Sequence, residues 1–488
     1  MVNFAKRLFK GDVALLSVII VLMLISLLVI FSSTGRLAYN EQGGNTWYYF
    51  LRQLGLCVSG LVVMWGMKFF SWRWLYQNVG VLLLVSAGLV ALAAFGGENI
   101  NGAGRWIRIP IIGITFQPSE MAKIAIVLYA AKLLSDFQEE NKCSSQVLKY
   151  FWAPLVVIGL IFLDNFSTSA LVGVVCLVMC WIARVRWQLL AKWLGIGVGA
   201  LVLLILLGIA FPKIQEAGRV GTIINRLVAW VGKDRESEEG KNYNYQSDQA
   251  HIAVAKGGMT GCGPGNSTQR NFLPHPYSDF IYAIIIEEYG LMGGFVILFL
   301  YSVILFRVGV IARRIMKAGQ VNPRGGPEIF PALMVFGLGF SIVLQALFHM
   351  GVNVGALPVT GQTLPLVSMG GTSLWFVCAS LGIILNTAYS FSSEGLEEEV
   401  KREKRNFFIR KVEVKREGVE EGDFEMERER SEHKRRVKKK VSEEDVFDVW
   451  TENDSQDVES GIEDEGREVL KELQRRRRRQ YKDNEDFD

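Results

Sequence analysis

The chain has 488 residues, half of them hydrophobic, and its formal net charge of +4 conceals an uneven distribution. Residues 393–488 carry 24 Lys or Arg and 31 Asp or Glu, whereas residues 1–392 hold only 29 basic and 18 acidic side chains. This division excludes a row of ordinary soluble domains, and without a free-standing basic domain it gives no reason to expect nucleic-acid binding.

Residues 1–392 contain apolar runs that are long enough to cross a membrane, since about 20 helical residues span a hydrocarbon layer of roughly 30 Å. We predict an all-α, polytopic membrane protein with about ten transmembrane helices, although the fifth and sixth are short and eight or nine would also fit. In chain order the expected spans are 13–32, 54–70, 79–95, 118–134, 151–163, 169–183, 194–211, 280–306, 331–350 and 372–389.

The distribution of Lys and Arg over the short loops predicts the orientation of these spans. With the N-terminus inside, fourteen basic residues fall in cytoplasmic loops and four in short exterior loops, as the positive-inside rule requires. Both termini are therefore expected in the cytoplasm. Residues 212–279, between the seventh and eighth spans, are expected to form a large extracytoplasmic loop.

The charged tail, 393–488, has alternating basic and acidic blocks and few apolar residues. Such composition is typical of disorder or of a solvated helix. The sequence leaves a second interpretation open, in which the tail is a cytoplasmic docking segment whose basic blocks contact anionic lipid or an acidic partner.

Polar residues on the exterior side of the membrane body are the candidates for chemistry, because ionisable groups at bilayer depth are costly. The first cluster consists of Arg105, Glu120 and Lys123. Glu120 and Lys123 stand three residues apart at the start of the fourth span, so they share one helix face. Two roles are open for Glu120 and Lys123: a buried structural ion pair, or a part in substrate binding.

The second cluster ends the long loop. Five glycines in the nine positions 257–265 would permit backbone amides to approach an anion closely, but their spacing is not that of a nucleotide-binding loop. Asp279 follows, where the chain enters the eighth span. From local sequence alone this carboxylate would be interpreted as a helix cap.

The third cluster, 353–373, is apolar and rich in Gly and Pro, and 354–373 carries no charged residue. At membrane depth such a segment must be a re-entrant loop that protein surrounds. Transporters contain similar segments, so this loop alone does not separate a transporter from an enzyme.

Taken together, the three clusters resemble the shape, elongation, division and sporulation (SEDS) family over nearly all of residues 10–390. The resemblance is carried by Arg105–Trp106, Phe116–Glu120, Gln246–Ser247, the glycine-rich stretch 257–265, Ser278–Ile281 and Pro358–Ser373. Residues 360–373 are more similar to the division members than to the elongation members. The family polymerises lipid II, a disaccharide-peptide on undecaprenyl diphosphate, into peptidoglycan strands outside the cytoplasmic membrane.

The resemblance implies roles, partners and a location. Asp279 would be the catalytic general base, and a class B penicillin-binding transpeptidase of the FtsI type would be a partner beside other division proteins. The location would be the bacterial cytoplasmic membrane, at the division septum. No cofactor is certain, but Mg²⁺ or Mn²⁺ is a candidate. The expected substrate-binding residues are Arg105, Glu120, Lys123, Gln246, Ser247, Ser267, Ser368, Gly370 and Gly371.

One departure from the family pattern lies between the fifth and sixth spans. Many relatives read Pro-Asp-x-Gly-Thr there, whereas this chain has Asn165 in the place of the acid and Asp164 before it. Either Asp164 substitutes for the family acid or its role is dispensable.

Two other functions compete with the enzyme. A lipid II flippase or other transporter would carry ionisable residues to mid-membrane and on to the cytoplasmic face, whereas the residues singled out above gather on the exterior half. A membrane scaffold whose tail recruits division proteins is compatible with catalysis. It predicts that deletion of the tail spares the enzymatic activity.

Overall fold

The computed structural model describes residues 11–96, 98–100, 103–108, 115–139, 142–210, 238–318 and 328–392. The expected charged tail, 393–488, lies outside the described residues, as does 212–237 of the expected extracytoplasmic loop. The proposed boundary at residue 392 therefore stays a prediction.

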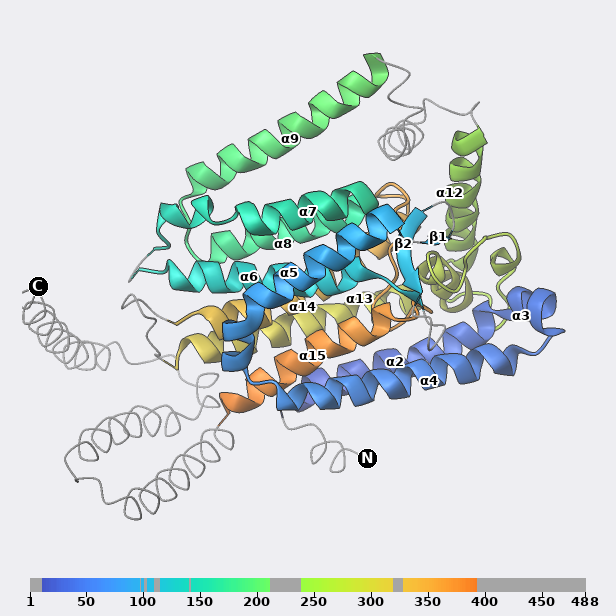
Figure 1. The fold of residues 1–488 in the computed structure, drawn as a ribbon. Coiled ribbons are helices and arrows are strands. Elements are labelled where there is room, and N and C mark those ends of the chain that lie inside the picture. Colours follow the sequence, from blue (N-terminus) through green and yellow to red (C-terminus); the bar gives the residue numbers. More distant parts are fainter. Residues whose placement is uncertain are drawn as a thin grey trace, which may run out of the picture. The chain divides into compact units, whose positions relative to one another are not determined.

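Eleven helices of 13 residues or more occur among the described residues, and all except Glu238–Gly257 overlap one expected span each (Figure 1). Six of them are long and apolar enough to cross a membrane: α2, α4, α5, α13, α14 and α15. The all-α membrane class is confirmed, while ten crossings remain a prediction. The ten helices that overlap expected spans are α2 (Val13–Ser33), α4 (Thr46–Gly66), α5 (Trp72–Gly96), α6 (Pro118–Asp136), α7 (Trp152–Asp164), α8 (Phe166–Ile182), α9 (Trp187–Ala210), α13 (Ile281–Met316), α14 (Phe330–Asn353) and α15 (Ser373–Ser390).

Two further helices and a small sheet lie between these helices. Helix α3 (Gly35–Gln42) follows α2, and α12 (Glu238–Gly257) occupies the described part of the long loop. Strands β1 (Glu98–Ile100), β2 (Ala103–Arg108) and β3 (Thr115–Phe116) form an antiparallel sheet in that order. The sequence analysis predicted none of these elements, although the Asn101–Gly102 pair between β1 and β2 is a strong hairpin signal.

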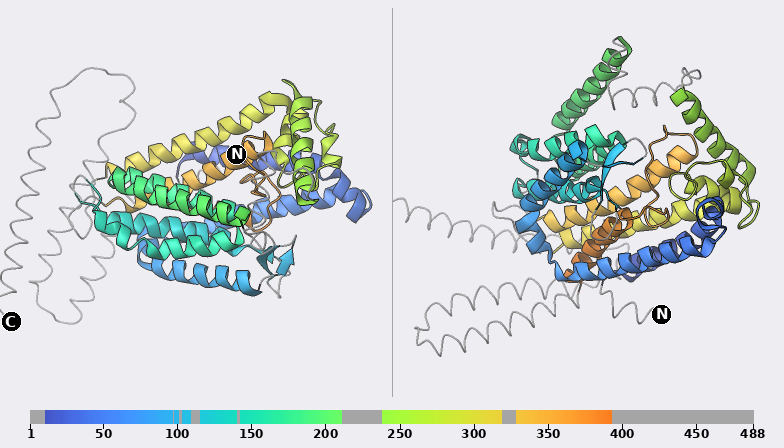
Figure 2. Two further views of the ribbon diagram at one scale, coloured as in Figure 1. Left: turned by 90° about the horizontal axis from the view of Figure 1, so that it is seen from above. Right: turned by 45° about the vertical axis from the view of Figure 1, so that its right-hand side comes forward.

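The core is organised around α14. In the apolar 18-residue stretch of α14 that could cross a membrane, 78% of the residues are buried, whereas the corresponding share for α4 is 22%. Helix α14 is therefore central and α4 peripheral. Helix α14 contacts α13, α6, α8 and α15, and it lies side by side with α13 in both views (Figure 2). Helix α4 packs on α15 and α2 and leaves an apolar face exposed, as expected for a helix that faces lipid.

Helix α13 is broken at Gly290, whose φ of 71° and ψ of −174° are not helical. A break at membrane depth must find new partners for the backbone groups that it frees. The amides of Leu291 and Met292 donate to carbonyls of the glycine-rich segment at 258 and 259. In return, the amides of Cys262 and Gly263 donate to carbonyls of α13 at 287 and 288, at 2.9 and 3.0 Å.

Polar contacts join helix ends that the charge pattern assigns to the cytoplasmic side. They keep charged and hydroxyl groups paired where the helices leave the apolar layer. These contacts are the ion pair of Asp12 with Arg307, the hydrogen bond from Tyr76 to Asp136, and the hydrogen bond of 2.6 Å from Ser135 to Glu328.

Candidate active site

Asp279 lies in the loop that immediately precedes α13, and it is half-buried. Its amide donates to the carbonyl of His275 at 3.1 Å, and the Ser278 hydroxyl donates to Asp279 Oδ1 at 2.9 Å. From α14, Asn353 Nδ2 donates to the carbonyl of Asp279 at 3.1 Å. The same Asn353 accepts from the amide of Ala283 through Oδ1 at 3.0 Å, so one buried side chain ties Asp279 to the first turn of α13.

The loop between α14 and α15 holds the same segment from a second direction. The Ser368 hydroxyl donates to the carbonyl of Ser278 at 2.8 Å and accepts from the amide of Leu364 at 2.8 Å. The amide of Met369 donates to the carbonyl of Tyr277 at 3.0 Å. Ser368, an expected substrate residue, is thus buried beneath the catalytic candidate and positions it.

One glycine of this loop, Gly361, borders the carboxylate of Asp279. A Cβ added at Gly361, where φ is 62°, would lie 3.6 Å from Asp279 Oδ2. Gly371 also has a positive φ, of 56°, and a Cβ added at Gly370 would lie 3.5 Å from Thr363 Oγ1. The backbone at Gly361 can therefore run close to Asp279. Contacts of Gly370 and Gly371 with a substrate stay predictions.

Glu120 and Lys123 form a buried ion pair, with 2.9 Å between Lys123 Nζ and Glu120 Oε1 and about 6% exposure of either side chain. Lys123 also donates to Gln345 Oε1 at 2.7 Å, and Gln345 Nε2 donates to the carbonyl of Thr363 at 3.0 Å. The pair is thereby joined to the loop that surrounds Asp279. Because Glu120 balances its charge, Lys123 offers little net positive charge to an anionic substrate.

The sequence analysis did not single out Gln345, and it included Asn353 only as the first residue of the third cluster, 353–373. Both are buried polar side chains on α14, which also carries Ser341 and His349. A polar residue within a transmembrane helix is a functional candidate by default, so this signal was available in the sequence. Their partners lie far away in the chain, and only the fold could identify them.

The connection between α7 and α8 reaches the same loop. Asn165 is the N-cap of α8, and its side-chain oxygen accepts from the amide of Thr168 at 3.3 Å. Gln362 Nε2 donates to the hydroxyl of Thr168 at 2.8 Å, and the carbonyl of Gln362 lies 2.7 Å from His349 Nδ1. An amide at 165 thus serves a capping role that needs no negative charge. The side chain of Asp164 lies outside the described part of the structure.

The glycine-rich segment does not offer its amides as the sequence analysis expected. The amides of Gly261, Cys262 and Gly263 already donate to backbone carbonyls, two of them on α13. A Cβ added at Gly261 would lie 2.2 Å from the carbonyl oxygen of Glu288. The glycines therefore serve the close approach of two backbones, and the expected anion cradle at these positions is corrected to a packing contact with the broken helix.

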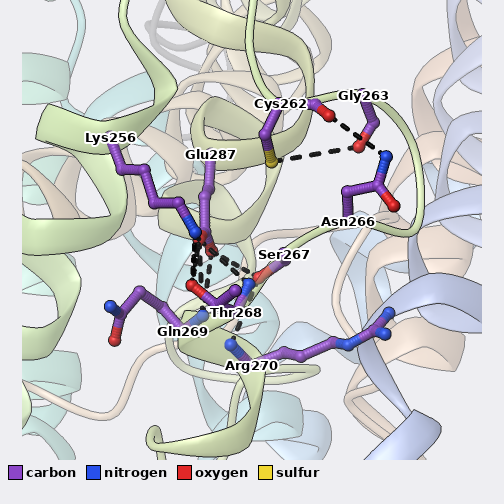
Figure 3. A network of polar contacts seen from close by, with 9 residues as sticks. All are labelled: Lys256, Cys262, Gly263, Asn266, Ser267, Thr268, Gln269, Arg270 and Glu287. Atoms are coloured by element: carbon purple, nitrogen blue, oxygen red, sulfur yellow. Dashed lines mark hydrogen bonds and ion pairs between the residues drawn. The ribbon is translucent and has the colours of Figure 1, made fainter.

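The carboxylate that this region does bind is that of Glu287, which is fully buried (Figure 3). It accepts from the hydroxyl of Ser267 and from the amides of Thr268 and Gln269, at 3.0 and 3.2 Å for the amides. Lys256 Nζ lies 3.4 Å from it. The hydroxyl of Ser267 is therefore directed to Glu287, and its contact with a substrate stays a prediction.

The remaining expected residues lie on neighbouring elements. Gln246 and Ser247 are half-buried on α12, which packs against α13. Arg105 lies on β2, and its side chain is outside the described part of the structure. The structure brings together Asp279, Ser368 and, through Gln345, the Glu120–Lys123 pair. Within the described part of the chain, no hydrogen bond or ion pair joins these residues to Gln246 or Ser247.

Comparison with known proteins places this architecture in a family. Residues 13–393 match the FtsW, RodA and SpoVE family of cell cycle proteins. A probable peptidoglycan glycosyltransferase FtsW of Coxiella burnetii is 31% identical over 386 residues, which cover 76% of this chain and 95% of the relative. One of the same name from Hahella chejuensis is 32% identical and covers 80% and 93%.

Solved structures share the fold. The RodA rod shape determining protein of Thermus thermophilus matches with a TM-score of 0.54 and 23% identity, covering 78% of this chain and 97% of that one. A chain from a study of polymerisation and crosslinking by a peptidoglycan synthase complex matches with a TM-score of 0.59 and 24% identity, covering 78% and 98%. At these identities the likeness extends to the fold alone.

Proposed function

Since the chain belongs to the FtsW, RodA and SpoVE family of cell cycle proteins, we propose that it is a peptidoglycan glycosyltransferase that polymerises lipid II. The observation that carries the proposal is that α14 and the loop between α14 and α15 both hold the backbone of the segment that bears the half-buried Asp279. The curated relatives named FtsW, at about 30% identity, favour a role in septal wall synthesis during division.

The reaction joins a sugar hydroxyl of one lipid-linked molecule to the anomeric carbon of another. The new bond forms between the hydroxyl oxygen and that carbon, while the bond from the carbon to the diphosphate oxygen breaks. A hydroxyl needs a destination for its proton before it attacks, and a carboxylate within hydrogen-bond reach supplies one. Asp279 takes that proton, and undecaprenyl diphosphate leaves with the bonding electrons.

The position of Asp279 suits a general base. Its main chain is held by Asn353 and by His275, whereas one carboxylate oxygen faces Gly361, which has no side chain. Holding a catalytic group in place before the substrate arrives lowers the entropic cost of the reaction. Ser278 donates to the other oxygen and orients the carboxylate.

A divalent cation is a second element of the proposal. Among the residues that the structure describes, no group of three or more His, Cys, Asp or Glu side chains could hold a metal ion. The described residues therefore do not form a resident metal centre of this kind. The remaining place for Mg²⁺ or Mn²⁺ is the substrate diphosphate, because Mg²⁺ is commonly held by substrate phosphates with one or two carboxylates.

The partner and the location follow from the same proposal. Glycan strands must be crosslinked after polymerisation, so we propose that a class B penicillin-binding transpeptidase works beside this chain. The neighbouring structure from a peptidoglycan synthase complex, whose study concerns polymerisation and crosslinking, supports that pairing. Polymerisation at the outer face of the cytoplasmic membrane, at the septum, completes the assignment.

The flippase alternative is weaker. The curated relatives named above are glycosyltransferases by name, and Lys123, which Gln345 links to the loop between α14 and α15, is already paired with Glu120. A transport path needs polar groups that can exchange partners along the bilayer. No observation on the described residues favours transport over catalysis.

The test is reconstitution of the purified full chain in detergent with fluorescent lipid II, with and without a class B transpeptidase. Glycan polymer that lysozyme digests is the expected product. In parallel, proteoliposomes report whether the chain moves lipid II between leaflets. Translocation without polymer under either condition would replace the glycosyltransferase by a transporter.

A further inference from the structure

A pocket lies close to the candidate base, between the α2–α3 corner and the segment that leads to Asp279. It is open to solvent, its empty volume together with that open space is about 530 Å³, and its polar lining consists of Ser33, Arg36, Asn40, Arg270 and Tyr277. Tyr277 stands two residues before Asp279, so the pocket borders the proposed reaction centre. We name it the Arg36–Arg270 pocket.

Arg36 and Arg270 give this pocket positive charge, although the carboxylate of Glu288 interacts electrostatically with Arg270. No described carboxylate lies within 4 Å of the guanidinium of Arg36 or Arg270. Arg36 donates to the carbonyl of Asn271, and Arg270 Nη1 donates to the carbonyl of Ser32 at 2.8 Å. These neutral acceptors fix the two side chains but do not cancel their charge.

Arg270 has a donor to spare. Its Nε is buried and has no hydrogen-bond partner in the described structure. Figure 3 shows the side chain directed away from Glu287. Glu288, whose carboxylate interacts electrostatically with Arg270, already accepts from the hydroxyl of Ser32. A shielded donor without an acceptor raises the gain from binding an anion.

Tyr277 adds a neutral hydroxyl to the same pocket. Burial, with the negative charges of Glu41 and Asp279 as lesser causes, raises the pKa of Tyr277, while Arg52 opposes the shift. The phenol therefore stays protonated at neutral pH. It can donate to a phosphate oxygen and does not repel one.

Polymerisation brings two lipid-linked diphosphates to one base, and each needs positive charge around it. Lys123 is neutralised by Glu120, and the amides of Gly261, Cys262 and Gly263 are taken by backbone carbonyls. The two arginines are the pair of described cations that line a pocket beside the Asp279 segment. Guanidinium groups match phosphate oxygens with two parallel hydrogen bonds, which suits this ligand.

We propose that the Arg36–Arg270 pocket binds the diphosphate of one polyprenyl-linked substrate, with Arg36 and Arg270 as its ligands. The proposal rests on the proposed function and goes beyond it by assigning a diphosphate site to residues outside the family signature segments. The prenyl chain leaves the pocket toward lipid, while the sugar lies toward Asp279.

The experiment measures binding to the purified full chain in detergent with three probes: farnesyl diphosphate, inorganic pyrophosphate and farnesol. Arg36→Gln and Arg270→Gln are each expected to weaken farnesyl diphosphate binding about tenfold or more, because each removes a charge-assisted contact. Arg313→Gln, an exposed arginine in the last turn of α13, is the matched control and should bind as the wild type does.

The three probes distinguish a lipid-linked diphosphate from free pyrophosphate as the ligand of the pocket. Tighter binding of farnesyl diphosphate than of pyrophosphate, with no binding of farnesol that depends on the arginines, supports a lipid-linked diphosphate. Equal binding of both diphosphates would contradict the lipid-linked assignment. The affinity should also fall with added salt in the wild type and less steeply in the arginine variants, which a merely structural effect would not produce.

Two further variants keep the outcomes separable. Arg36 is exposed on α3, so Arg36→Gln carries the test even where Arg270→Gln lowers the folded yield. Asp279→Asn should lose polymerisation yet retain farnesyl diphosphate binding. Undiminished binding in the Arg36→Gln/Arg270→Gln double variant overturns the pocket alone, whereas arginine-dependent binding by a wild-type chain that makes no polymer overturns the proposed function alone.

Discussion

Asn353→Ala should lower the free energy of unfolding of the protein. It should also lower the catalytic rate, because Asn353 holds the base, Asp279, in place. The side chain is fully buried and binds the amide of Ala283 and the carbonyl of Asp279. Its removal leaves both backbone groups without these partners. Each buried unpaired group costs about 1–3 kcal/mol, so the free energy of unfolding should fall by about 2–6 kcal/mol.

The effect on catalysis should exceed the effect on substrate affinity, because Asn353 holds the base and does not bind the substrate in this account. A displacement of about 1 Å can cost on the order of 100-fold in rate. The assay follows lipid II polymerisation at several substrate concentrations, normalised to the folded fraction from thermal unfolding. We expect kcat to fall by about that factor while KM changes little.

Asn386→Ala is the matched control at the other end of the bundle. Its Nδ2 donates to the carbonyls of Phe70 and Met67 at 2.8 and 3.4 Å. This variant should lose about 1 kcal/mol of stability and keep the wild-type kcat. A wild-type kcat in folded Asn353→Ala, or an equal loss of kcat in Asn386→Ala, would refute the positioning role of Asn353.

Three further predictions concern packing, charge and metal. Gly261→Ala should prevent stable folding, since its Cβ would meet a carbonyl oxygen at 2.2 Å, whereas Gly265→Ala, at nearly the same φ and in open space, should cost far less in thermal unfolding. Lys123→Gln should lower the free energy of unfolding by about 3–5 kcal/mol, because it leaves Glu120 unpaired. Adding Glu120→Gln should recover part of this loss, and no recovery in the double variant would contradict the ion pair. EDTA should slow polymerisation, with recovery on adding Mg²⁺ or Mn²⁺, but leave the melting temperature unchanged; a melting temperature that falls with EDTA would indicate a resident metal site.

The positions of the long helices could be predicted because hydrophobic length is a local property of the sequence. Boundaries were less certain where polar or aromatic residues begin a helix. The helix expected at 54–70 begins at Thr46 in the structure. The prediction began too late because 46–53 is rich in aromatic residues and contains Arg52, so it does not look like part of an apolar span. Helix α13 continues to Met316, beyond the apolar run that ends at 306.

The break in α13 could not be predicted, because it depends on a contact between distant segments. Gly290 is one of three glycines in 290–294, and nothing local marks it as the residue with a positive φ. The break is stabilised by backbone hydrogen bonds with 258–263. The same long-range pairing explains why a glycine-rich stretch that suggested an anion cradle is instead a packing element.

The candidate site was predictable in its parts and not in its connections. Asp279 and Ser368 came from the resemblance, and the fold adds that Ser368 lies beneath the Asp279 segment. The i, i+3 spacing of Glu120 and Lys123 predicted a shared helix face, and the structure pairs them. Gln345, which links that pair to the loop around Asp279, needed the packing of α6 against α14 to emerge.

The most direct test of the account compares Asp279→Asn with Asp248→Asn in lipid II polymerisation by the purified chain with its transpeptidase partner. Both variants remove one carboxylate from the outer region of the chain, and Asp248 is exposed on α12. Asp279→Asn should fold normally and lose polymerisation by a factor of about 10²–10⁴, whereas Asp248→Asn should keep the wild-type rate. Glycan strands made by Asp279→Asn at the wild-type rate would contradict the assignment of Asp279 as the general base.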